Sequence, residues 1–132
     1  MTSVTLELDA IYKLAHDVMM ANGCDADNAA ALADIICRAE RDGSHSHGLF
    51  RVPGYVKALR SGKVDGKAKP EAKHLTPAVI QVDGKGCFAP LAQAVGLPLL
   101  ASATGKIGIA ALSLVGIHHF AALWPETEYM AD

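Results

Sequence analysis

The stretch IGIAALSLV, residues 107–115, is a nearly continuous apolar run, and it constrains the fold more than any other segment. An apolar run of this length predicts a strand covered by helices on both faces. It is shorter than a bilayer span, as is the apolar stretch 88–101, so the sequence predicts no transmembrane helix. The chain has 132 residues, which suits one compact unit.

The N-terminal part is expected to be helical. Apolar residues recur at three-and-four spacing along 8–22, which predicts a first helix. Asp25 and Asp27 are both good N-cap residues for a second helix, which Gly43 ends. Pro53 is suited to the first position of a short third helix that runs to Gly62.

The second half is expected to mix strands and helices. Residues 61–73 are rich in Gly and Lys and indicate a solvated connection, whereas AVIQVD, 78–83, favours a strand. Residues 90–104 predict a helix that Pro98 either kinks or divides, and the acids after Pro125 favour a further helical turn. The fold class is therefore α/β, with α+β left open. Three segments are expected: a helical segment 1–62, a solvated linker 63–76, and the start of an α/β domain at 77–132.

Charge and cysteine content narrow the choice of partners. Twelve cations against fourteen anions give a net charge of −2, which favours neither nucleic acid nor an anionic membrane. Cys24, Cys37 and Cys87 are odd in number and far apart, as expected of reduced thiols. The first ten residues carry acids where an export signal needs cations, so we expect a cytoplasmic protein.

The six histidines include two clusters, His45 with His47 and His118 with His119. Imidazoles in such clusters are typical of zinc or iron sites. No carboxylate or thiolate stands at ligand spacing beside them, and adjacent histidines on a strand or turn point in different directions. We therefore expect no metal.

A second interpretation takes Ser46, His47 and Arg51 together. Four residues separate His47 from Arg51, so one helical turn places both side chains on the same face. A guanidinium fork suits a carboxylate, and an imidazole delivers a proton near neutral pH. The three residues thus suit a small 2-oxo or 2-imino acid, although Pro53 disfavours helical geometry at Val52. The alternative is a surface loop in which Arg51 pairs with a helix carboxylate, and spacing leaves both open.

Two stretches carry a resemblance to a known family. RAERDGSHSHGLFRVPGYVKALRSGKV resembles the signature of the type 2 malate/L-lactate dehydrogenase family. VDGKGCFAPLAQAVGLPLLASATGKIGIAALSLVGIHHFAALWPE is similar to the next family segment, which ends in a His-Phe motif. The residues after that histidine look most like the branch that reduces pyrroline-2-carboxylate and piperideine-2-carboxylate.

The resemblance implies an NAD- or NADP-dependent oxidoreductase that transfers hydride between the nicotinamide and a small carboxylate substrate, often as a dimer. Ser46 and His47 would form the proton-donating pair, and Arg51 would hold the substrate carboxylate. In some members the histidine that matches His119 is the acid/base, so both assignments stay open. The family binds its cofactor without Gly-x-Gly-x-x-Gly, which this sequence also lacks. The cofactor-lining residues would be His119, Phe120, Ala121, Ala122 and Leu123.

The sequence departs from the family pattern at two places and in length. His45 stands where Asp usually precedes Ser-His-Gly, and Val115 to His118 replace a stretch that often contains Asn-Ser. Family members are considerably longer and supply a relay aspartate after the matching segment, so we expect an N-terminal portion that is inactive alone. The alternative is a catalytically inactive truncated or oligomerisation module whose histidines are structural.

Overall fold

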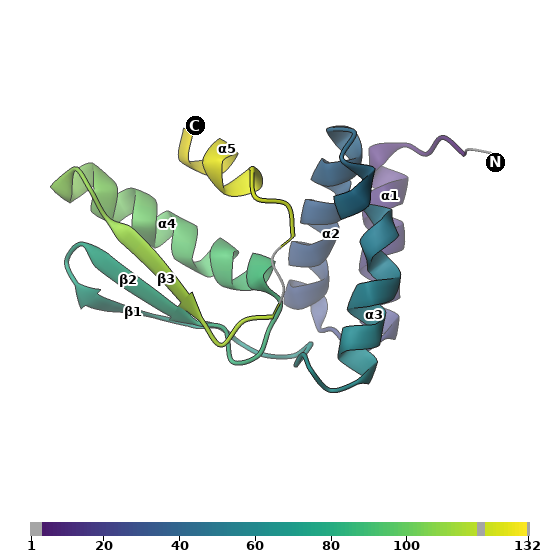
Figure 1. Ribbon diagram of the computed structural model, residues 1–132, viewed down its shortest axis with the longest axis horizontal. Coiled ribbons are helices and arrows are strands. Elements are labelled where there is room, and N and C mark those ends of the chain that lie inside the picture. The colour runs from purple at the N-terminus through teal and green to yellow at the C-terminus, as the bar shows by residue number, and fades with distance from the viewer. Residues whose placement is uncertain (1–3, 119–120, 132) are drawn as a thin grey trace.

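The computed structural model describes residues 4–118 and 121–131. Figure 1 shows the helices of the N-terminal part at one end of the molecule and the sheet, lined by a long helix, at the other. The short C-terminal helix lies above the long helix. The helices are α1 (Leu8–Ala21), α2 (Ala26–Arg41), α3 (Val52–Arg60), α4 (Ala89–Ile107) and α5 (Pro125–Ala131).

The sheet has three strands in the order β1-β2-β3: β1 (Glu71–Thr76), β2 (Val79–Asp83) and β3 (Ala111–Val115). β1 and β2 pair antiparallel, whereas β2 and β3 pair parallel with α4 as the crossover. Ile80 and Val82 of β2 are buried, and Val82 belongs to the cluster formed with α4 and β3. The α/β class with a helical N-terminal layer is therefore confirmed.

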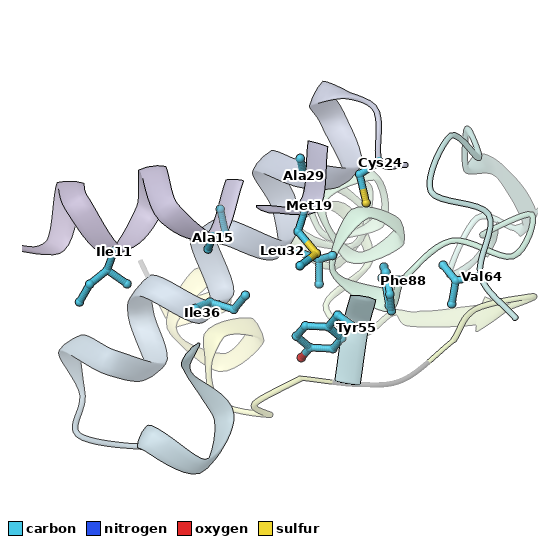
Figure 2. Close-up of a cluster of buried hydrophobic side chains, with 11 residues drawn as sticks. Ile11, Ala15, Met19, Cys24, Ala29, Leu32, Ile36, Tyr55, Val64 and Phe88 are labelled. Carbon is cyan, nitrogen blue, oxygen red and sulfur yellow. The ribbon is translucent and has the colours of Figure 1, made fainter. Parts of the chain in front are cut away.

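The helical layer is held by one apolar cluster, drawn in Figure 2. The expected face of α1 is buried through Ile11, Ala15 and Met19, and Asp25 caps α2 by accepting from the backbone N–H of Asn28 at 3.0 Å. The cluster reaches the second half of the chain through aromatic rings. Tyr55 of α3 meets Phe88, at the start of α4, edge to face with ring centroids 5.2 Å apart.

The Gly- and Lys-rich stretch differs from the expected solvated connection. Val64 and Ala68 are buried, and the Ala68 carbonyl accepts from Asn28 Nδ2 at 3.1 Å. Residues 71–76 form β1, and all six of them are exposed. A strand exposed on both faces has no apolar alternation, so only its pairing with β2 reveals it. The proposed linker boundaries at 63 and 76 stay a prediction.

The apolar run 107–115 is not one buried strand. Ile107 is the last residue of α4, which continues through Pro98, and Gly108 ends the helix in the left-handed conformation with φ of 89°. The strand covers only Ala111–Val115, whose side chains are half-buried or exposed. The expectation of burial on both faces is thus wrong in the described chain, because only the face toward α4 is covered. The helix expected after Pro125 is confirmed as α5.

Candidate active site

The Ser-His-Gly motif lies in two short 3₁₀ turns that follow α2. The first turn, η1, is His45–His47, the second, η2, is Leu49–Arg51, and Gly48 separates them. α3 begins immediately after η2 with Val52 in helical geometry (φ −52°, ψ −45°). The expectation that Pro53 keeps Val52 out of the helix is therefore wrong, and the helix starts one residue before Pro53.

Ser46 joins the other two residues of the motif. Its Oγ lies 3.0 Å from Nδ1 of His47, and its carbonyl oxygen accepts a hydrogen bond from Nε of Arg51 at 2.9 Å. Ser44 Oγ stands at 3.5 Å from the same ring nitrogen. Among the described residues, the Ser46 bond is the one hydrogen bond that the Arg51 side chain makes, and no helix carboxylate pairs with it. The structure thus brings Ser46, His47 and Arg51 together without the surface ion pair of the alternative interpretation.

Arg51 opens onto a pocket of about 200 Å³ between α3 and the segment after β3. Burial raises the pKa of the Tyr55 phenol, which nearby Arg51 only partly offsets, so the hydroxyl is protonated at neutral pH. The pocket therefore combines a guanidinium with a protonated phenol. Its lining residues are Arg51, Gly54, Tyr55, Ala58 and His118.

His118 is a pocket residue that the sequence reasoning did not assign. Its backbone N–H donates to the Cys87 carbonyl at 2.8 Å, and its ring meets Phe88 with centroids 6.0 Å apart. The sequence offers no signal that places His118 in this pocket, because the placement depends on contacts with distant parts of the chain. Ser46 and His47 do not line it.

The segment expected to line the nicotinamide is described in part. His119 and Phe120 lie outside the described residues. Ala122 is buried, Ala121 is half-buried, and Leu123 is 69% exposed.

Trp124 follows this segment and lies beside the motif. Its ring meets that of His47 edge-on, and its Nε1 donates to Oδ2 of Asp42 at 2.9 Å. Asp42 also binds Arg41, and these hydrogen bonds, led by that from Arg41, lower the pKa of its carboxyl. On α5, Glu128 pairs with Arg41 at 3.3 Å, which fastens the C-terminal helix to α2.

The described part of the chain contains neither a membrane-spanning helix nor a cluster of metal ligands. No helix among residues 4–118 and 121–131 is long and apolar enough to cross a bilayer. Within the same residues, no three His, Cys, Asp or Glu side chains converge as a metal site requires.

A helical layer, a parallel β2-α4-β3 crossover and a Ser-His-Gly turn place the chain in the α/β class of malate- and lactate-type dehydrogenases. The Malate/L-lactate dehydrogenase family profile matches residues 6–132, and the chain belongs to this family. The predicted resemblance is thereby confirmed.

Two curated relatives are reductases of a cyclic imino acid by name. The chain is 46% identical over 125 residues to a Delta(1)-pyrroline-2-carboxylate reductase of Ancylobacter novellus, covering 95% of this chain and 37% of that protein. It is 41% identical over 128 residues to the Delta(1)-pyrroline-2-carboxylate/Delta(1)-piperideine-2-carboxylate reductase of Pseudomonas syringae, covering 97% and 37%. The chain thus spans well under half the length of the relatives it matches.

Solved structures agree on the fold. The crystal structure of delta1-piperideine-2-carboxylate reductase from Pseudomonas syringae superimposes with a TM-score of 0.91 at 40% identity, over 96% of this chain and 38% of that one. Malate dehydrogenase from Entamoeba histolytica gives a TM-score of 0.86 at 21% identity, over 95% and 35%. The second likeness is one of fold alone.

Proposed function

We propose that this chain supplies the carboxylate-binding and proton-donating part of a nicotinamide-dependent reductase site for a cyclic 2-imino acid. The observation that carries the proposal is the double role of Ser46, which holds His47 through its hydroxyl and Arg51 through its carbonyl. The names of the Ancylobacter and Pseudomonas relatives support the imino acid as substrate. Small 2-oxo and 2-hydroxy acids share the carboxylate and form the broader substrate class.

Arg51 is proposed to bind the substrate carboxylate. Because Ser46 engages only Nε, the terminal guanidinium nitrogens are left to form two parallel hydrogen bonds with a carboxylate. The uncharged surfaces of Tyr55 and Ala58 in the same pocket suit the methylene groups of a small ring. Loss of water from such a pocket strengthens the ion pair.

His47 is proposed to donate the proton. As an imidazolium, His47 donates from Nδ1 to the Ser46 hydroxyl and carries its second proton on Nε2, the nitrogen directed away from Ser46. That proton is then available to the nitrogen of an imine, or to the oxygen of a 2-oxo acid, as the substrate is reduced. His119 stays the competing candidate for this role.

The described residues after His118 suit the flat face of a cofactor ring. Ala121 and Ala122 are small, and Leu123 presents apolar surface. We assign His119, Phe120, Ala121, Ala122 and Leu123 to the nicotinamide end of NAD or NADP, which supplies the hydride when bound.

A ligand titration of the 132-residue chain tests the proposed carboxylate site. Pyrrole-2-carboxylate serves as a flat analogue that cannot be reduced, and binding is followed by nitrogen-15 NMR. We expect shifts at the Arg51 Nε–H and at the Tyr55 and His118 amides. Arg51→Lys should weaken binding about tenfold or more, because an ammonium cannot replace the bidentate fork.

The control for this titration is Arg60→Lys. Arg60 is an exposed arginine at the end of α3 that donates to Asn22 Oδ1 at 3.0 Å, and it is not among the residues that line the pocket. This variant should bind the analogue as the wild type does. Absence of a shift at Arg51 at saturating analogue, or equal weakening in both variants, would remove Arg51 from the proposed site.

A further inference from the structure

Glu40 places one carboxylate between the two 3₁₀ turns of the motif. It lies in the last turn of α2, and its side chain is only 14% exposed. Oε2 lies 2.6 Å from Nδ1 of His45, the first residue of η1. Oε1 accepts from the backbone N–H of Leu49, the first residue of η2, at 2.7 Å. Each carboxylate oxygen therefore holds one turn.

Gly48 makes this position of the carboxylate possible. A Cβ atom at residue 48 would lie 2.0 Å from Oε1 of Glu40 and 2.5 Å from its Cδ. Any side chain there would push the carboxylate away from both turns. The requirement for glycine in Ser-His-Gly thus has a steric cause in this chain, and the cause is Glu40.

We propose that Glu40 is a positioning residue for the proposed reaction. It fixes η1, which carries Ser46 and His47, relative to η2, which carries Arg51. A carboxylate suits the task because it offers two acceptors at a fixed separation, and charge-assisted hydrogen bonds are stronger than neutral ones. The consequence for turnover rests on the proposed function, whereas the geometric coupling of the two turns does not.

The hydrogen bond from Arg51 Nε to the Ser46 carbonyl reports this coupling directly. It joins η2 to η1, and Glu40 is not one of its partners. If Glu40 sets the two turns relative to each other, its loss will weaken this bond as well as its own bond to Leu49. A merely local role would affect Leu49 alone.

Hydrogen exchange in the 132-residue chain provides the test. In Glu40→Ala we expect exchange at both the Leu49 N–H and the Arg51 Nε–H to accelerate about tenfold or more. Gly48→Ala leaves Glu40 in place but displaces its carboxylate, so it should reproduce both effects. Glu40→Gln keeps an acceptor for the Leu49 N–H, so exchange at both positions should be as slow as in the wild type. This result would show that the fast exchange in Glu40→Ala does not come from a general loss of folding.

Asp34→Ala is the matched control. Asp34 is another acid of α2, and it pairs with Arg38 at 2.9 Å. Neither exchange rate should change in this variant. Unchanged exchange at Arg51 Nε in both Glu40→Ala and Gly48→Ala would overturn the proposal.

Binding of pyrrole-2-carboxylate separates this inference from the proposed function. Where exchange accelerates as described, Glu40→Ala should also bind the analogue about tenfold or more weakly, since misplacement by about 1 Å is costly in a polar site. If exchange accelerates in Glu40→Ala but the wild-type chain does not bind the analogue, the positioning role of Glu40 is supported and the proposed carboxylate site is overturned.

Discussion

The imidazole of His47 meets the indole of Trp124 edge-on, with ring centroids 6.3 Å apart and an interplanar angle of 72°. Asp42, directly after α2, holds the indole N–H. The end of α2 therefore fixes two separate parts of the proposed site, the histidine through the turn that follows and the tryptophan through a carboxylate.

Trp124→Phe removes the N–H donor and keeps an aromatic ring. We expect the free energy of unfolding to fall only modestly, because the hydrogen bond that is lost is exposed to solvent. Urea unfolding of Trp124→Phe, Asp42→Ala and the double variant measures the coupling between the two residues. Because Asp42→Ala already removes the hydrogen bond, adding Trp124→Phe should cause no further loss of stability. If the losses of the two single variants simply add in the double variant, the hydrogen bond contributes nothing.

The proposed roles of His47 and Arg51 predict different kinetic defects. The test uses a chimaera in which residues 1–132 replace the matching segment of the Pseudomonas syringae reductase. His47→Ala should lower kcat by about 10² to 10⁴, as loss of a general acid does, with cofactor affinity nearly unchanged. Arg51→Lys should instead raise KM, with a loss of about 1 to 3 kcal/mol in transition-state binding.

His119→Ala provides the comparison in the same chimaera. It should weaken nicotinamide binding more than it lowers kcat. If it abolishes turnover while nicotinamide binding is intact, the roles of the two histidines are exchanged. An Arg51→Lys enzyme with the parental KM would contradict the carboxylate assignment.

The elements that depend on residues close together in the chain could be predicted from the sequence. The spacing of Ile11, Ala15 and Met19 indicated α1. The four-residue spacing of His47 and Arg51 predicted one helical turn, but the structure has two 3₁₀ turns separated at Gly48, and the bond to Arg51 comes from the backbone carbonyl of Ser46. Contacts between distant segments had no such signal. The position of Trp124 beside His47 depends on where the chain returns after β3, which no periodicity describes.

The missed features have the same origin. β1 is exposed along its whole length and depends on pairing with β2. Ile107 looks like part of a strand, but α4 extends through it until Gly108 allows the left-handed end. The place of His118 in the pocket could not be predicted from the sequence, because it depends on the backbone hydrogen bond from His118 to the distant Cys87.

Asp25 is expected to make folding stability depend on pH in the acid range. Burial raises the pKa of its carboxyl, but hydrogen bonds from Lys69 and Asn28 outweigh burial and lower the pKa to about 2. A carboxyl with a lowered pKa stabilises the fold above its ordinary pKa near 3.8, and this contribution disappears as the pH falls toward 2.

Asp25→Asn tests this dependence, because asparagine keeps the N-cap acceptor and removes the charge. At pH 7 we expect a loss of about 1 kcal/mol, reduced by the exposure of Lys69 to solvent. The difference from the wild type should shrink between about pH 4 and pH 2, measured by urea unfolding at each pH. A constant difference over that range would mean that the charge of Asp25 contributes nothing.

Two glycines of α4 should respond to alanine with opposite signs. A Cβ at Gly105 would meet nothing within 4 Å, so Gly105→Ala should stabilise the chain by about 0.5 to 1 kcal/mol through helix propensity. A Cβ at Gly96 would lie 2.7 Å from a methyl group of Leu112 in β3 and 3.1 Å from Val82. Gly96→Ala should therefore cost about 1 kcal/mol or more despite the same gain in propensity. Thermal unfolding of both variants and the wild type measures the two effects. Equal stabilisation by both alanines would show that α4 is loosely packed on the sheet.

The outer edge of β3 should cause the 132-residue chain to self-associate. β3 pairs with β2 on one side, and among the described residues no strand pairs with its other side. Unpaired backbone groups beside apolar side chains favour pairing with a second chain. Ile109, just before β3, is 78% exposed. Sedimentation should thus show a dimer or larger species that dissociates on dilution.

Ile109→Lys should shift this equilibrium toward the monomer, because a charge beside an unpaired strand opposes pairing, and an exposed residue can be replaced with little loss of stability. Val4→Lys is the matched control. Val4 is 79% exposed and precedes α1, which Figure 1 places at the end of the molecule opposite β3. This variant should associate as the wild type does. A wild-type chain that stays monomeric over a wide concentration range, or equal effects of the two lysines, would contradict association through β3.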